Sequence, residues 1–296
     1  MTNSATGASI ELRPIEPADG EECARIVYEA FGRVHDHHRF PREFPTLDVA
    51  REVIGACIEH PSIWGVVAER DGRIAGSNFL DERGPIRGVG PISVDPSTQA
   101  QGVGRRLMEA VLKRGEGARG IRLLQETFNL QALSLYASLG FEVKEPAVVM
   151  SGRPRSDPPA GIDVRPLEEG DLDACDRLCR SVHGFERTEE LRDALGSPVL
   201  APVVAVRDGR LTAWGTTFAS FPAVCAVAET ERDMRALISG AAARAAAPVS
   251  FLLPTRQAGL MRWCLREGLR FTKPMTYMSI GEYRDPDGCW IPSVLY

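Results

Sequence analysis

The two halves of this amino-acid sequence are similar, and this internal repeat constrains the fold more than any other feature. Residues 10–26, I-E-L-R-P-I-E-P-A-D-G-E-E-C-A-R-I, return at 162–178 as I-D-V-R-P-L-E-E-G-D-L-D-A-C-D-R-L, an offset of 152 (162 minus 10). The hairpin pattern V-V-A-E-R-D-G-R-I at 66–74 returns at 203–211, an offset of 137. Further on, Gly140 returns as Gly268, an offset of 128. The repeat predicts two copies of one fold, the second of them shorter.

The repeat also sets the expected domain organisation. A chain of 296 residues is long enough for two domains with separate cores. We expect the first domain over residues 8–150, a linker rich in Pro, Gly and Ser over 151–161, and the second domain over 162–296. Each half reads as a strand, two helices, a hairpin feeding a third long strand, and then helix, strand, helix and strand. This order predicts an α/β fold, in the α+β sense of a mixed sheet.

The composition excludes several classes of protein. Hydrophobic residues make up 44% of the chain and charged residues 25%, which is typical of a globular protein. The net charge of −5 and the lack of a Lys/Arg run argue against a nucleic-acid partner. The polar start M-T-N-S-A-T-G-A-S is no signal peptide, and no apolar stretch is long enough for a membrane span. Seven scattered cysteines predict reduced thiols in a cytoplasmic protein rather than disulfides or zinc.

A short strand, a loop with two glycines and a helix follow one another in I-S-V-D-P-S-T-Q-A-Q-G-V-G-R-R, residues 92–106. The N–H groups of residues 101–105 fall where the helix begins, and such an end binds phosphate. Gly102 and Gly104 have no Cβ, so a diphosphate can approach the backbone closely. No Gly-Lys-Ser/Thr or third spaced Gly follows, which excludes a Walker loop and the dinucleotide fingerprint. An ordinary strand-to-helix turn is the alternative.

A second motif lies downstream of this loop. Residues 121–127 predict a buried strand, and F-N-L-Q-A-L-S-L-Y-A-S-L-G-F-E at 128–142 predicts a helix with an apolar stripe. Asn129 is the expected N-cap of this helix, and Gly140 is expected to end it in a left-handed conformation.

Together the two motifs resemble the acyl-CoA motifs of the GNAT N-acetyltransferases. The pattern V-x-P-x-x-Q-x-x-G-x-G begins here at Val94, and N-x-x-A-x-x-L-Y-x-x-x-G-F begins at Asn129. The resemblance covers residues 10–150 and implies two tandem GNAT-like folds, in which the pantetheine arm of acyl-CoA fills a gap between the splayed fourth and fifth strands. Gly90-Pro91 fits a local break in the fourth strand. The implied cofactor-binding residues are Ile92, Ser93, Val94, Gln99, Ala100, Gln101, Gly102, Val103, Gly104, Arg105, Asn129 and Tyr136.

The resemblance implies that a primary amine of a small molecule or peptide attacks the thioester of acetyl-CoA directly, without a metal. The Ile92 N–H would then bind the oxyanion and the Tyr136 hydroxyl would protonate the leaving thiolate. Tyr136 could instead be a packed core residue, and Asn129 could bind the pantetheine arm, cap its helix or do both. A homodimer stays open, as do two rival functions: a non-catalytic acyl-CoA sensor and a structural pseudo-acetyltransferase.

The general base has several candidates. Glu126 lies on the strand that lines the expected gap, and we place it first. Asp81 and Glu82 end the preceding hairpin strand, and a water chain without a dedicated base is equally possible. The terminal carboxylate of Tyr296 is an outside candidate, because the apolar end of the tail can dock back onto the protein.

We expect the acceptor side to be a loop over residues 31–45, F-G-R-V-H-D-H-H-R-F-P-R-E-F-P. Its residues His35, His37 and His38, with Asp36, have the types that a metal site needs, but a polar, aromatic loop over the substrate mouth is the favoured interpretation. The arginines of this loop suit an acceptor with a carboxylate or phosphate, or are solvated; they are Arg33, Arg39 and Arg42.

The second half lacks the residues for this chemistry. Its counterpart of the phosphate loop, A-V-A-E-T-E-R-D-M-R-A-L at 226–237, has no glycine and carries Glu229, Glu231 and Asp233, which would repel a diphosphate. Gln257 stands in place of Asn129, and Cys264 in place of Tyr136. We therefore expect a degenerate second domain, which either walls part of the acceptor site or only stabilises the first.

Overall fold

The structure, a computed structural model, describes residues 9–296 apart from Ala100, Pro198 and Tyr296. The chain divides into two compact units. The first unit comprises the described residues up to Glu82 together with Val89–Ala118, and the second comprises Arg83–Gly88 together with the described residues from Arg119 onward. The phosphate-loop motif belongs to the first unit and the Asn129–Tyr136 motif to the second.

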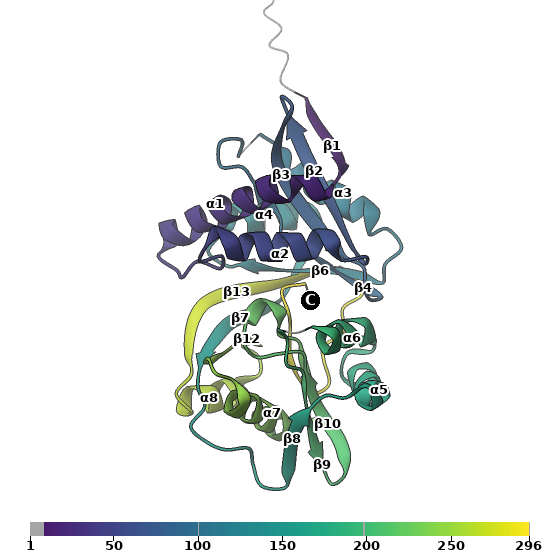
Figure 1. Ribbon diagram of the computed structural model, residues 1–296, viewed down its shortest axis with the longest axis vertical. Coiled ribbons are helices and arrows are strands. Elements are labelled where there is room, and N and C mark those ends of the chain that lie inside the picture. Colours follow the sequence, from purple (N-terminus) through teal and green to yellow (C-terminus); the bar gives the residue numbers. More distant parts are fainter. Residues whose placement is uncertain (1–8, 100, 198, 296) are drawn as a thin grey trace, which may run out of the picture. The chain divides into compact units, whose positions relative to one another are not determined.

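In the first unit, an antiparallel sheet in the order β1-β2-β3 carries two helices on one face (Figure 1). The helices α1 and α2 pack side by side, and their buried faces meet the sheet in a cluster around Val27, Ile54 and Phe79. The predicted hairpin turn joins β2 to β3, with Asp71 and Gly72 both at positive φ (52° and 72°). The elements are β1 (Ile10–Pro14), α1 (Gly20–His38), α2 (Leu47–Glu59), β2 (Ile63–Arg70), β3 (Arg73–Asp81), β5 (Ser93–Val94) and α3 (Val103–Arg114).

The predicted third long strand is interrupted. Its first part, β4 (Ile86–Val89), pairs in parallel with β6 (Gly120–Glu126) from Ile86 to Gly88, within the second unit. The peptide bond Gly90–Pro91 is cis, and beyond it β5 pairs with β3, within the first unit. Beyond Gly90-Pro91 the predicted strand no longer pairs with β6.

The main sheet of the second unit mixes strands from both halves of the sequence, in the order β4-β6-β13-β7-β12. The strand β13 (Arg270–Gly281) of the second half pairs with β6, and its repeat counterpart in the first half, β7 (Glu142–Gly152), pairs with β12 (Val249–Pro254). Strands β7 and β13 also pair with each other. The two halves have thus exchanged the strands β7 and β13. The compact units follow these tertiary contacts, whereas the predicted domain boundaries describe the sequence repeat.

A second sheet of the same unit has the order β14-β11-β10-β9-β8. Its strands belong to the second half, and its turn Asp208-Gly209 has the same positive φ values as the first hairpin (52° and 73°). The predicted mixed α/β fold is confirmed, with a similar succession of helices and strands in both halves. The second half has the single strand β11 where the first has β4 and β5, and it ends with the additional strand β14. The remaining elements are α4 (Leu130–Ser138), β8 (Ile162–Pro166), α5 (Leu172–His183), α6 (Thr188–Gly196), β9 (Val203–Arg207), β10 (Arg210–Gly215), β11 (Ala226–Ala228), α7 (Glu231–Arg244), α8 (Ala258–Arg266) and β14 (Cys289–Ile291).

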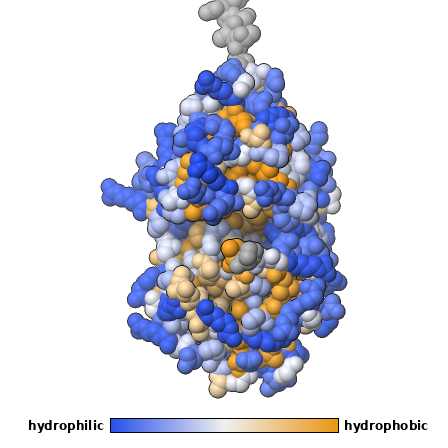
Figure 2. Space-filling model, viewed as in Figure 1, coloured by the Kyte–Doolittle hydropathy of each residue, from blue (hydrophilic) through white to orange (hydrophobic). Residues whose placement is uncertain are grey.

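Hydrophilic side chains cover most of the face drawn in Figure 2, with apolar patches between them. Among the described helices, none is long and apolar enough to cross a membrane. All seven cysteines are buried free thiols, as the sequence predicted, and burial raises the pKa of Cys23, for example, to about 12.

Candidate acyl-CoA site

The N-terminus of α3 is built as the sequence predicts for an anion site. Gly102 is the N-cap residue and has φ +87°, a left-handed conformation that a residue with a Cβ adopts only with strain. The first intrahelical bond runs from the Arg106 N–H to the Gly102 carbonyl (3.1 Å), so the N–H groups of the turn before it are not used within the helix. No acidic residue stands in this first turn. Among the described residues other than the two chain neighbours, no atom lies within 4 Å of the place that a Cβ at Gly102 would take. This helix end is open to an anion.

A tight turn before α3 fixes the approach of the chain. The Asp95 carboxylate accepts bonds from the N–H and the hydroxyl of Ser97 (2.8 and 2.6 Å), and the Asp95 carbonyl accepts from the Thr98 N–H (2.8 Å). Arg25 of α1 donates to the same carboxylate (2.9 Å). With burial opposing them, these bonds hold the pKa of Asp95 below its usual range. The turn is therefore held by an ionised Asp95 and anchored to α1.

The other residues of the predicted loop have varied surroundings. Ser93 is buried in β5, and Ile92, which directly precedes that strand, is half-buried. Val94 and Gln99 are half-buried, and Gln101 and Arg105 are exposed. In the first turn of α3, Val103 is buried and Gly104 is half-buried. Ala100 lies outside the described residues.

In the second unit, α4 carries both predicted residues of the second motif. The Asn129 Oδ1 accepts the N–H of Ala132 (3.1 Å), which confirms Asn129 as the N-cap. Tyr136 is buried, and its ring meets Phe141 edge to face at 6.2 Å. Burial, together with the charge of Glu126, raises the pKa of the Tyr136 hydroxyl. The phenol therefore keeps its proton at neutral pH and is available as a donor.

Glu126, the first candidate for the base, ends β6 and is buried. Its Oε1 lies 2.7 Å from the ammonium nitrogen of Lys273 on β13. Lys273 is also buried, and its nitrogen lies 4.8 Å from the centre of the Phe221 ring. The carboxylate of Glu126 is thus held in an ion pair that the second half of the sequence supplies.

The other candidates for the base have different surroundings. Asp81 is buried at the end of β3, whereas Glu82 receives two bonds from the Arg114 guanidinium (3.1 and 2.8 Å). Tyr296 lies outside the described residues. The tail before it does dock within the second unit, where the Val294 N–H donates to the Pro222 carbonyl (3.0 Å).

The loop expected over residues 31–45 is wrong in its first half, because α1 continues to His38. Nothing in F-G-R-V-H-D-H-H breaks a helix, and three histidines in the last turn interact favourably with the helix dipole. The helix ends where Arg39 turns left-handed, with Arg42 paired to Asp36 and stacked over Tyr28. Only the segment from Arg39 to Thr46 is a loop. Arg33 and Arg39 are exposed.

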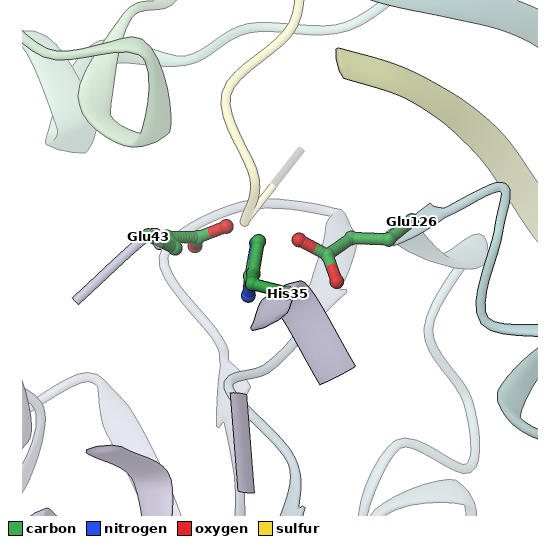
Figure 3. Close-up of side chains that lie close together, drawn as sticks. All are labelled: His35, Glu43 and Glu126. Atoms are coloured by element: carbon green, nitrogen blue, oxygen red, sulfur yellow. The ribbon is translucent and has the colours of Figure 1, made fainter. Parts of the chain in front are cut away.

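The three histidines of α1 therefore do not converge as loop residues would. His37 and His38 are exposed and contact each other, whereas His35 is buried and its Nδ1–H donates to the Phe31 carbonyl (2.7 Å). A His35 ring nitrogen and a Glu43 carboxylate oxygen lie within 4.8 Å of each other. Figure 3 shows His35 on its helix, Glu43 on the following segment, and Glu126 on its own strand.

The matching helix end in the second half is closed. Thr230 caps α7 by accepting the Asp233 N–H (3.2 Å), and Asp233 itself is buried. Although burial opposes ionisation, hydrogen bonds from Arg207, Thr230 and Thr212 hold the pKa of Asp233 below its usual range. The first turn of α7 thus carries an ionised carboxylate, whereas the first turn of α3 carries no acidic residue.

The second half also replaces the second motif. Gln257 precedes α8 without capping it, and its side-chain amide instead binds the backbone of Trp290 twice (2.6 and 3.1 Å). Cys264, in the place of Tyr136, is buried, and burial raises the pKa of its thiol to about 12.

Sequence reasoning missed Lys273 and Arg25. A single Lys in the strand R-F-T-K-P-M-T-Y-M-S was a signal that this side chain needs a partner. The partner itself was not visible, because Glu126 lies 147 residues earlier in the chain.

Comparisons with known proteins agree with the fold and the motifs. Residues 60–143 match the acetyltransferase (GNAT) domain family. A mycothiol acetyltransferase of Thermomonospora curvata is 41% identical over 78 residues, which span 25% of this chain and 26% of the relative, so the chain matches about a quarter of that protein's length. These matches and the fold place a GNAT acetyltransferase domain in this chain.

Solved structures resemble the whole chain. A Pyrococcus horikoshii protein assigned to the acetyltransferases has a TM-score of 0.76 at 14% identity, covering 100% of this chain and 98% of the other. A tandem GNAT protein from the clavulanic acid biosynthesis pathway has a TM-score of 0.58 at 14% identity, covering 92% and 98%. A GCN5-related N-acetyltransferase of Sphaerobacter thermophilus reaches 0.63 at 16% identity, covering 95% and 98%. The chain therefore has the tandem GNAT fold.

Proposed function

We propose that the protein is an acetyl-CoA-dependent N-acetyltransferase that acetylates a primary amine of a small molecule or peptide, and that only its first half is catalytic. The observation that carries this proposal is the open N-terminus of α3, with its left-handed Gly102 and no acidic residue in the first turn. A helix end of this kind binds a diphosphate through backbone N–H groups. The match of residues 60–143 to GNAT acetyltransferases supports the same assignment.

The chemistry assigned to the other residues follows from what each can donate or accept. The amine has to lose a proton before its lone pair attacks the thioester carbon, and we assign acceptance of that proton to the Glu126 carboxylate. As the C–S bond breaks, Tyr136 donates its proton to the thiolate, and the Ile92 N–H binds the oxyanion. Since the Asn129 cap uses Oδ1, we assign the Asn129 amide N–H groups to the pantetheine arm.

The first experiment measures acetyl-CoA binding by calorimetry and CoA release over a panel of amines, including polyamines, aromatic amines, amino sugars and short peptides. We expect binding and amine-dependent release of CoA. Binding without turnover on any amine would replace the enzyme by an acyl-CoA sensor, and no binding at all would leave a structural pseudo-acetyltransferase.

A second experiment isolates the role of Tyr136. Replacing Tyr136 by Phe removes the hydroxyl and keeps the ring that packs on Phe141. We expect kcat to fall about 100-fold with an unchanged Kd for acetyl-CoA, because a general acid acts on the chemical step. An unchanged kcat would make Tyr136 a core residue only.

A further inference from the structure

We propose that Lys273, supplied by the second half of the chain, is a positioning residue for the Glu126 carboxylate. The inference rests on the proposed function, since it adds a residue to the site where Glu126 accepts the proton of the amine. The direct observation is the ion pair, with Lys273 Nζ 2.7 Å from Glu126 Oε1. The two side chains are only 4% and 9% exposed.

The strand exchange explains how a second-half ammonium reaches a first-half carboxylate. Met275 of β13 stands opposite Glu126 of β6 in the antiparallel register. Lys273 lies two residues before Met275, so its side chain leaves the strand on the same face of the sheet. A second half that folded on its own, with β13 beside β12, would not bring this ammonium to β6.

The surroundings of the pair make Lys273 more than a surface counterion. Phe221 lies under the ammonium at 4.8 Å, and it packs with Leu124, Met275 and Val294 in one apolar cluster. A carboxylate that is buried without a partner is costly. Lys273 therefore balances the charge of the Glu126 carboxylate and fixes the direction of its side chain.

The pair is compatible with a carboxylate that accepts a proton. A carboxylate has two oxygens with about four acceptor sites, so a contact at Oε1 does not exhaust its capacity. In the proposed step the proton passes from the acceptor ammonium to Glu126, while Lys273 forms and breaks no covalent bond. Tyr136 of α4 also interacts electrostatically with Glu126.

The internal repeat supplies a natural comparison for this pair. Glu145 of β7 is the repeat counterpart of Lys273, at the offset of 128 (273 minus 145). Glu145 is buried and pairs with Arg256, which lies two residues past the end of β12. This second ion pair also joins the two halves, but its charges are reversed. The carboxylate of Glu145 lies on the exchanged strand β7, and the guanidinium of Arg256 lies near the end of β12. Only the first half holds a carboxylate where the proposed chemistry needs one.

The test is a double-mutant cycle on the full-length protein, with kcat measured for acetyl-CoA and the best amine of the panel. We expect Lys273→Met to lower kcat at least about 10-fold in the natural protein but less than about 3-fold in a Glu126→Gln background. Lys273→Arg retains the charge, and we expect it to restore most of kcat. Arg256→Met is the matched control, since it breaks the reversed pair, and we expect kcat within about 2-fold of the natural protein.

Several results would overturn the proposal. If Lys273→Met lowers kcat equally in both backgrounds, Lys273 does not act through Glu126. In that case a low kcat of Glu126→Gln alone would still support Glu126 as the proposed base. A natural kcat for Glu126→Gln would instead reject that base, and with it the positioning role. An equal loss of kcat in Arg256→Met would show a general effect on the fold.

A buried carboxylate without its partner also destabilises a protein. If Lys273→Met does not fold, Lys273→Gln takes its place, since it keeps a donor for Glu126 Oε1 without the charge. We expect it to bind acetyl-CoA with the natural Kd and to lose kcat as described for Lys273→Met. A natural kcat for Lys273→Gln would also overturn the proposal.

Discussion

The N-termini of α3 and α7 occupy the same place in the two repeats and treat negative charge in opposite ways. At α3 a left-handed glycine leaves the first-turn N–H groups available, and no acidic side chain is near them in sequence. At α7 the N-cap Thr230 uses the Asp233 N–H, and the Asp233 carboxylate stays with the helix end. The comparison teaches that negative charge is stabilising at a helix N-terminus, and that either a side chain of the protein or a bound ligand can supply it.

The two ends also differ in what stabilises the fold around them. Asp233 receives hydrogen bonds from Arg207 (2.9 Å) and Thr212 (2.9 Å), so the α7 end is tied to β9 and β10. The turn before α3 is anchored by the ion pair of Asp95 with Arg25 and by the Asp95 N–H, which donates to the Ala75 carbonyl (2.9 Å). A helix end that is satisfied internally adds stability, whereas one that is left open is available for binding.

The largest expected effect is a loss of stability when the N-terminus of α7 is altered. Replacing Asp233 by Ala removes a buried carboxylate and leaves the donors around it unsatisfied, so we expect the free energy of unfolding to fall by about 3–5 kcal/mol. Urea unfolding measures this loss. The Kd for acetyl-CoA of the remaining folded protein should be unchanged, and a weaker Kd would mean that the second half takes part in binding.

The next effect is on the open end. Gly102→Glu places a carboxylate at the α3 N-terminus, and we expect the Kd for acetyl-CoA to rise at least about 100-fold, or about 2.7 kcal/mol. Gly102→Ala is the control for backbone strain at φ +87°, and its Cβ meets no other atom. If Ala weakens binding as much as Glu does, strain and not charge is responsible; an unchanged Kd for Glu would remove the loop from the site.

The third prediction concerns the pH dependence of stability in the second half. Burial, together with Arg187, Arg122 and Arg284, holds the pKa of His183 well below its usual value. Below about pH 6.5 the unfolded chain takes up a proton that the folded protein excludes, so stability falls as the pH falls and is unaffected above about pH 7. We expect a loss of about 2 kcal/mol between pH 7 and pH 5 from this group. His183→Phe should lack this part of the loss in urea unfolding, and an equal pH dependence would contradict the assignment.

The smallest effect sharpens the role of the α4 cap. Asn129→Ala removes the bond to the Ala132 N–H, and we expect about 1 kcal/mol less stability. Asn129→Asp keeps an acceptor for the cap but has no amide donors for the pantetheine arm. If Asn129→Asp is as stable as the natural protein but has a raised Kd for acetyl-CoA, capping and pantetheine binding are separate roles of Asn129. If its Kd is unchanged, Asn129 is a cap only.

Local features of the sequence predicted their local structures well. The Asp-Gly turns, the Asn129 cap and the start of α3 each depend on a few neighbouring residues with strong conformational preferences. The region after Phe31 was predicted poorly, because its histidines, arginines and aromatic residues have weak preferences. There the continuation of α1 to His38 prevailed over the expected loop.

The sequence by itself determined the two copies of one fold, the glycine-capped helix end without acidic residues in the first copy and the acidic helix end of the second. Each of these features depends on short segments of the chain, because backbone geometry and helix dipoles act over a few residues. Only the tertiary structure decided that β7 and β13 exchange their pairing partners and that Lys273 meets Glu126. Strand order depends on hydrogen bonding and burial between segments far apart in the chain, and very similar strands in the two repeats can pair in either way.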